Sequence, residues 1–247
     1  MSEIWIASDW HLAPGSPAAH GRLALAFLTA AHAAGARVIL NGDVFDDLFA
    51  GPGRSQAAHP AVLAAMEALS AERRLARTRG NHDPEVSDAQ VELDWPGLGR
   101  VLVAHGHAAD PVNASPVGRL GDAISRRFGR LGVVRGAAWL AESVARAVAQ
   151  DYMIATFRRR CLALVERGGY ALGVFGHVHS AHLARDDRYA NAGALLDGVL
   201  EYLVLGASGP RLESLRDASI GAAPAARAVV IPDQPSRSAG REDLPPR

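Results

Sequence analysis

Short apolar segments recur along the chain, and each is followed by polar residues. Five of them have the length and the apolar character of buried β-strands: Ile4–Ala7, Arg37–Leu40, Leu75–Thr78, Val101–Ala104 and Ala171–Phe175. Between some of them, Ala18–Ala34 and Pro60–Ala71 carry apolar residues at helical spacing. Strands that alternate with helices predict α/β layering.

The polar residues that follow these strands are of a few types. Each strand is followed by His, Asp or Asn: Asp9 and His11, Asp43, Asn81 and His82, His105, and His177 and His179. The C-terminal edge of an open α/β sheet is where ligands bind. Residues i and i+2 of an extended segment point to the same side, so Asp9 and His11, like His177 and His179, can address one centre. Flanking glycines permit unusual backbone angles there: Gly42, Gly80, Gly106 and Gly176.

These side chains are typical of a catalytic metal site. Imidazole and carboxylate ligands suit manganese, iron, zinc or nickel, and Cys161 is the only cysteine, so a thiolate cluster is excluded. Seven candidate ligands are too many for one ion. A carboxylate that bridges two ions about 3.5–4 Å apart would accommodate them, an arrangement that clamps an in-line displacement at phosphorus.

The remainder of the chain has a different pattern. Residues 112–168 predict a helical insertion between two strands, built from Val117–Phe128, Gly136–Ala149 and Tyr152–Arg167. The apolar residues of its middle part would cover a substrate as a lid, pack on the core or form a dimer: Leu131, Val133, Val134, Trp139, Leu140 and Val144. Later strands are expected at Leu200–Leu205, Arg211–Arg216 and Ala228–Ile231. One domain would then span residues 1–231, and the polar tail 232–247 is expected to be disordered.

Composition restricts the partners and the compartment. The 26 basic residues, all arginine, balance 26 acidic ones, so no overall field draws the protein to nucleic acid. The N-terminal residues lack the pattern of a signal peptide, and no apolar run reaches membrane-spanning length. We therefore expect a cytoplasmic protein. The oligomeric state and the native metal are left open.

Five blocks in order, SDWHL, GDVFD, GNHD, HGH and GHVH, resemble the motifs of the calcineurin-like metallophosphoesterase superfamily. The resemblance spans residues 8–179. It implies a four-layer α/β/β/α sandwich of two mixed sheets that carries the helical insertion. It also implies two divalent ions, of which manganese is expected first, and a metal-bridging hydroxide that attacks phosphorus.

The resemblance also implies a role for each matching residue. Asp9, His11 and His179 would hold the first ion, and Asn81, His105 and His177 the second. Asp43 would bridge them. His82 would act on the phosphate or on the leaving oxygen, and Asp46 and Asp83 would orient ligands through hydrogen bonds. His82 as a merely orienting residue, and His107 as a ligand in place of His105, are the alternatives.

Substrate choice depends on the parts around the metals. The length, the SDWHL start and the position of the insertion resemble UDP-2,3-diacylglucosamine pyrophosphohydrolases of lipid A synthesis, which implies a nucleotide-sugar-lipid substrate and peripheral contact with the inner membrane. Arg126, Arg127 and Arg130 are the candidate substrate-binding residues. His82, His107 in the HGH block and Ser180–Ala181 depart from those enzymes, so a general small-molecule phosphatase or phosphodiesterase is the alternative. A nuclease would need a longer basic groove, and a non-enzymatic scaffold would be expected to have lost ligands.

Overall fold

The computed structural model describes residues 2–128, 151–184 and 187–217. Its helices are α1 (Ala18–Ala33), α2 (Asp47–Ala50), α3 (Arg54–Ala58), α4 (Pro60–Ala71), α5 (Pro116–Phe128) and the short 3-10 helix η1 (His107–Ala109), and residues 151–168 form a further helix. Its strands are β1 (Ile4–Ala7), β2 (Arg37–Asn41), β3 (Leu75–Thr78), β4 (Gln90–Trp95), β5 (Gly99–Ala104), β6 (Leu172–Phe175), β7 (His182–Leu183), β8 (Tyr189–Asn191), β9 (Leu195–Leu196), β10 (Val199–Gly206) and β11 (Gly209–Arg216).

The strands form two mixed sheets. In the first, the order is β11-β10-β1-β2-β3, and β9 pairs with β10. Strand β1 lies at its centre, where Ile6 is opposite Ile39 of parallel β2 and Leu203 of antiparallel β10. The second sheet has the order β4-β5-β6-β8-β7, with β5, β6 and β8 parallel. The parallel strands of each sheet therefore end at a common edge, where their polar loops can meet.

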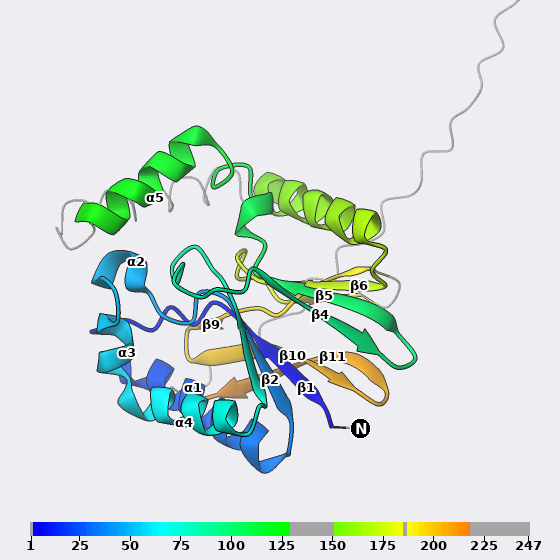
Figure 1. Ribbon diagram of the computed structural model, residues 1–247, viewed down its shortest axis with the longest axis horizontal. Coiled ribbons are helices and arrows are strands. Elements are labelled where there is room, and N and C mark those ends of the chain that lie inside the picture. The colour runs from blue at the N-terminus through cyan, green and yellow to red at the C-terminus, as the bar shows by residue number, and fades with distance from the viewer. Residues whose placement is uncertain (1, 129–150, 185–186, 218–247) are drawn as a thin grey trace, which may run out of the picture.

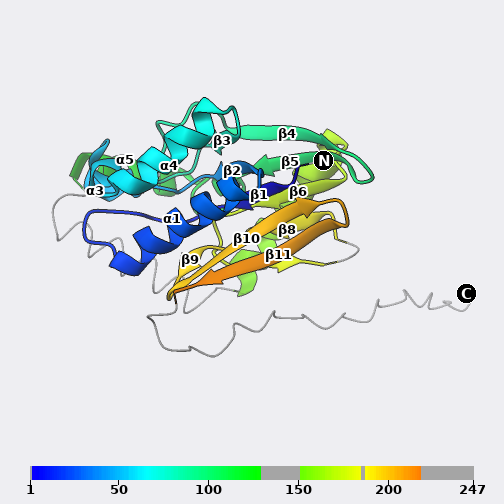
Figure 2. The same ribbon diagram turned by 90° about the horizontal axis from the view of Figure 1, so that it is seen from below.

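The helices and the two sheets form four layers (Figures 1 and 2), and three clusters of buried side chains lie between them. Helices α1 and α4 cover the outer face of the first sheet with residues such as Phe27 and Met66. The second cluster, which includes Ile6 and Val174, lies between the two sheets. The third packs the helix 151–168 on the outer face of the second sheet, through Phe157 and other apolar residues. The predicted α/β/β/α sandwich is confirmed.

The structure adds elements that the pattern did not predict. Strand β4 alternates exposed and half-buried residues and pairs with β5 as an antiparallel hairpin, and β7, β8 and β9 are too short for a periodic signal. The helix predicted at Tyr152–Arg167 as part of the insertion is present as residues 151–168, and Phe157, Cys161 and Val165 on it are buried in the core. This part of the predicted insertion is therefore a layer of the sandwich.

Some predictions concern residues outside the described ranges. They are the helix Gly136–Ala149, the strand Ala228–Ile231, the tail 232–247, Arg130 and the apolar residues between Leu131 and Val144. Among the helices that the structure describes, none combines the length and the apolar character needed to cross a bilayer.

Candidate metal centre

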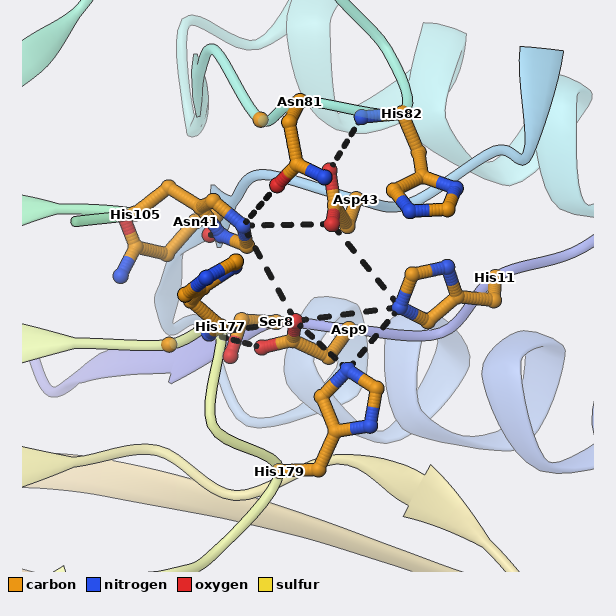
Figure 3. A network of polar contacts seen from close by, with 12 residues as sticks. Ser8, Asp9, His11, Asn41, Asp43, Asn81, His82, His105, His177 and His179 are labelled. Carbon is orange, nitrogen blue, oxygen red and sulfur yellow. Dashed lines mark hydrogen bonds and ion pairs between the residues drawn. The ribbon is translucent and has the colours of Figure 1, made fainter. Parts of the chain in front are cut away.

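The loops after β1, β2, β3, β5 and β6 converge at one edge of the sandwich. Figure 3 shows the predicted residues that these loops bring together: Asp9, His11, Asp43, Asn81, His82, His105, His177 and His179. A side chain joins the two sheets here, because Nδ2 of Asn41 at the end of β2 donates to the carbonyl oxygens of Ala104 (3.1 Å) and Val174 (3.4 Å). These two hydrogen bonds therefore hold the ligand loops of the first sheet next to those of the second.

The backbone at these positions adopts a conformation that non-glycine residues rarely take. Of the seven described non-glycine residues with positive φ, five are predicted ligands: Asp9 (56°), His11 (45°), Asp43 (54°), His177 (71°) and His179 (51°). Each such angle costs free energy, on the order of 1 kcal/mol, and persists where the surrounding structure enforces it. The concentration of these angles at one place indicates that the loops are shaped to aim side chains.

Three side chains form the first ligand cluster. The Nε2 atom of His179 lies 3.2 Å from Oδ1 of Asp9 and 3.1 Å from Nε2 of His11. The Nε2 atom of His11 lies 3.9 Å from the same Asp9 oxygen. Two imidazole nitrogens and a carboxylate oxygen that face one another at this spacing are the donors of a divalent transition-metal site.

The second ligand cluster lies on the other side of Asp43. Nε2 of His105 is 3.2 Å from Oδ2 of Asp43 and 3.3 Å from Oδ1 of Asn81. His177 belongs to the same group, in which potential ligand atoms of Asp43, His105 and His177 all lie within 4.8 Å of one another. Oδ2 of Asp43 is also 3.8 Å from Nε2 of His11, so a single oxygen faces both clusters.

Hydrogen bonds outside the clusters indicate which nitrogen two of the histidines, His105 and His177, present to a metal. The Nδ1 atom of His105 donates to the carbonyl oxygen of Asn41 at 2.9 Å, which leaves Nε2 for a metal. Nε2 of His177 contacts Oδ2 of Asp110 at 2.9 Å, and a donation to this carboxylate leaves Nδ1 as the ligand atom. Asn113 lies 3.1 Å from the same His177 nitrogen. Sequence reasoning missed Asp110 and Asn113, which precede His177 by more than sixty residues.

Asp83 and Asp46 occupy positions around the ligands. The Asp83 carboxylate accepts the backbone N–H groups of Asp43 (3.0 Å), Val44 (3.0 Å) and Gly80 (2.9 Å), so it ties two ligand loops together. Asp46 Oδ1 lies 2.9 Å from Nδ1 of His82. A Cβ atom on Gly80 would lie 2.0 Å from Oδ1 of Asp43, which explains why this loop requires glycine.

His82 lies beside the first cluster. Its ring centroid is 4.6 Å from that of His11, in an edge-on arrangement, and its backbone N–H donates to Oδ1 of Asp43 at 2.8 Å. Its side chain is 18% exposed, so a substrate can reach it. Among the predicted substrate-binding arginines, Arg127 lies over the ring of Phe128, and the side chains of Arg126 and Arg130 are outside the described part of the chain.

Burial and neighbouring charges define the electrostatics of the centre. Burial opposes ionisation of Asp9 and Asp43, but the nearby histidines, with His105 first, hold the pKa of both carboxyl groups below the usual range. Burial likewise opposes protonation of His105, yet the charges of Asp43 and Asp9 raise its pKa to about 10. Burial, then His82, lowers the pKa of His11 to about 4. The two ionised carboxylates stabilise a positive charge beside them, here the protonated His105 ring, so the site is suited to cations. The oxygen and nitrogen donors fit two divalent metal ions.

Comparisons with known proteins were consistent with this geometry. A family model described as Calcineurin-like phosphoesterase matches residues 2–181. No curated protein matches the chain.

Several solved structures resemble the fold. A dimetal phosphatase from Danio rerio is 11% identical, with 87% of this chain and 98% of that chain covered and a TM-score of 0.48. Wild-type Vps29 complexed with zinc from Entamoeba histolytica is also 11% identical, with 87% and 98% covered and a TM-score of 0.42. A predicted phosphoesterase from Streptococcus pneumoniae is 13% identical, with the same coverage and a TM-score of 0.40.

Proposed function

The chain belongs to the calcineurin-like phosphoesterase family and is a hydrolase of phosphoester bonds, and we propose that it works with two divalent metal ions held by the two clusters at the sheet edge. The observation that carries the proposal is the position of Asp43. One of its oxygens is 3.8 Å from Nε2 of His11 and 3.2 Å from Nε2 of His105, so it can bridge two ions.

Each residue has a defined task in this proposal. Asp9, His11 and His179 hold one ion, and Asn81, His105 and His177 hold the other. When bound, such ions polarise the phosphoryl oxygens and make water a better nucleophile near neutral pH. We take manganese as the first candidate, with iron, zinc and nickel as alternatives, because this donor set suits all four.

His82 completes the reaction. As the oxygen of water bonds to phosphorus, the bond from phosphorus to the leaving oxygen breaks, and that oxygen needs a proton. Asp46 accepts from Nδ1 of His82 and stabilises the protonated ring, so Nε2 can supply the proton or offset charge on the phosphate. A proton from water restores the ring for the next turnover.

Metal content and turnover test this function together. We expect about two transition-metal ions per chain by mass spectrometry and metal-dependent hydrolysis of bis-p-nitrophenyl phosphate. Asp43→Ala should lose both. His32→Ala, which changes an exposed histidine on α1 paired with Glu72, is the matched control and should retain both. A stable protein that binds no metal and hydrolyses no ester would overturn the proposal and favour a scaffold.

For the substrate, we propose UDP-2,3-diacylglucosamine, cleaved at its pyrophosphate in lipid A synthesis. Helix α5 supports this choice, because Leu120 (61% exposed), Ile124 (44%) and Phe128 (48%) form an exposed apolar stripe at i, i+4 and i+8. Such a stripe suits acyl chains or peripheral contact with the inner membrane from the cytoplasmic side. The alternative is a general small-molecule phosphatase or phosphodiesterase.

Changing this stripe separates the two substrate classes. The triple variant Leu120→Ser, Ile124→Ser, Phe128→Ser should lose activity toward the lipid and binding to anionic vesicles, while it retains activity toward bis-p-nitrophenyl phosphate. This design leaves the buried helix 151–168 intact. Wild-type protein that hydrolyses the simple ester but never the lipid would favour the alternative.

A further inference from the structure

A cleft of about 600 Å³ adjoins the metal centre without being part of it. It lies between the helix 151–168 and the start of β4, and its wall includes Gly106 and His107, which directly follow the candidate ligand His105. The ring centroids of His105 and His107 are 5.5 Å apart. A molecule bound in the cleft would therefore lie within a few side chains of the candidate metals.

The cleft has an unbalanced positive charge. Arg79, Arg160 and Arg167 line it, and none of the described residues that line it carries a carboxylate. Arg79 donates to the carbonyl oxygens of Val86 and Ser87, both at 2.7 Å, and these bonds fix its guanidinium in place. Carbonyl groups leave the charge of a guanidinium uncompensated, so the cleft is complementary to an anion.

Arg160 and the apolar residues of the cleft also favour an organic anion. Arg160 donates to the carbonyl oxygen of Ala109 at 3.3 Å and so joins the helix 151–168 to η1. Ala104, Ala163 and Leu164 give the cleft an apolar surface, and Leu164 is 38% exposed. The volume is in the usual range for an organic ligand. Apolar walls with arginines among them match an organic anion better than a bare inorganic ion.

We propose that this cleft binds a second anionic group of the substrate, so that the preferred substrates are organic phosphoesters with two separate anionic groups. One group would be hydrolysed at the metal centre. The other, a phosphate or carboxylate on an organic body, would bind Arg79 and Arg160. This proposal rests on the proposed function, because it assigns the substrate of the same metal site. Within that function it favours the small-molecule alternative, because UDP-2,3-diacylglucosamine carries its only anionic groups in the pyrophosphate that would be cleaved.

A matched pair of substrates tests the cleft. The p-nitrophenyl ester of thymidine 5′-phosphate and the same ester with an added 3′-phosphate differ only in the second anion. In the wild type, the 3′-phosphate should lower KM about tenfold. Arg160→Gln and Arg79→Gln should remove this advantage, so that each variant has similar KM values for the two esters. Arg159→Gln, on the same helix but outside the cleft, should keep it.

Direct binding separates a failure of this proposal from a failure of the function. If neither ester is hydrolysed, the proposed function fails, and calorimetric titration with thymidine 3′,5′-bisphosphate still tests the cleft. Weaker binding by Arg160→Gln than by Arg159→Gln supports the anion site. Equal binding by the two variants, or an equal KM for the two esters in the wild type, overturns it.

Discussion

At the scale of single residues, His82 differs from the ligands in what it can be expected to do. It lies beside His11 and contacts Asp46, and it is partly exposed. We expect His82→Ala to lower kcat by about 10²–10⁴ while the protein keeps its metal ions, because a positioned proton donor contributes about that much. Turnover and metal content measured on the same sample check this.

The matched variant for His82 is Asp46→Asn. It keeps the ring but replaces the carboxylate that stabilises the protonated form, so its loss of turnover should be smaller. Unchanged turnover in His82→Ala would leave His82 with only an orienting role. Loss of metal in the same variant would make it a ligand, and either result would contradict the proposed role.

Asp110 is the residue through which His177 is oriented. Its Oδ2 atom lies 2.9 Å from Nε2 of His177, and its Oδ1 atom accepts the backbone N–H of Val112 at 2.6 Å. Partners of this kind typically contribute about 10–100-fold to metal affinity. We therefore expect Asp110→Asn to weaken metal binding by about that factor in a chelator competition.

Asp110 also accepts a hydrogen bond from the backbone of the following turn, so a second variant is needed to separate this contact from the one to His177. Asp110→Ala loses both contacts, whereas Asp110→Asn keeps an oxygen for the turn, so only the first should also lower the melting temperature markedly. Equal metal affinity in the wild type and Asp110→Asn would show that His177 is oriented without this carboxylate.

At the scale of elements, the helix 151–168 is part of the core. Phe157 is 1% exposed, and its ring lies 6.4 Å from that of Phe175 on β6 and 5.6 Å from that of His177. Truncation of a buried phenylalanine usually costs about 3–5 kcal/mol. We expect Phe157→Ala to lower the free energy of unfolding by about that amount in urea titrations, and exposed Arg159→Ala to change it by less than about 0.5 kcal/mol. Similar values for the two variants would contradict a core role for the helix.

The sequence predicted the strands that deliver ligands better than the other elements. Apolar runs such as Ile4–Ala7 are continuous because parallel strands are buried on both faces, and their polar ends recur in a recognisable order. Strand β4, an edge strand with alternating charged residues, gives no such signal. The helix 151–168 does carry Phe157, Cys161 and Val165 at helical spacing, but periodicity cannot tell which surface an apolar stripe covers.

Contacts between residues far apart in the chain could be predicted from the sequence only where the residues belong to a recognisable motif. The residue types and order of Asp9, His11 and His179 suggested a cluster, and the structure brings these side chains together. Asp110 has no comparable pattern, because its partner is 67 residues away and one aspartate in a loop is ordinary. Backbone angles could not be predicted from the sequence either. The positive φ of His177 is enforced by the structure around the loop and not favoured by the residue type.

At the scale of the whole molecule, the candidate metal centre is a junction between the two sheets. Asp9 and Asp43 follow β1 and β2 of the first sheet, whereas His105 and His177 follow β5 and β6 of the second. Metals bound there would link the two sheets at one edge. Since the ligands converge only in the folded chain, metal binding should stabilise the fold by mass action.

Chelation therefore tests the junction. A ligand that binds only the folded state at a concentration a thousand times its Kd adds about 4 kcal/mol. We expect a chelator to lower the melting temperature of the purified protein by several degrees, and added Mn²⁺ to restore it. In Asp43→Asn, which lacks the bridging carboxylate, the chelator should lower the melting temperature much less. The quantity compared is the change in melting temperature that the chelator causes in each protein, and not the melting temperatures themselves. If the wild type and Asp43→Asn respond equally, the sheets are held together by their shared apolar core and by Asn41, and the metals contribute chemistry alone.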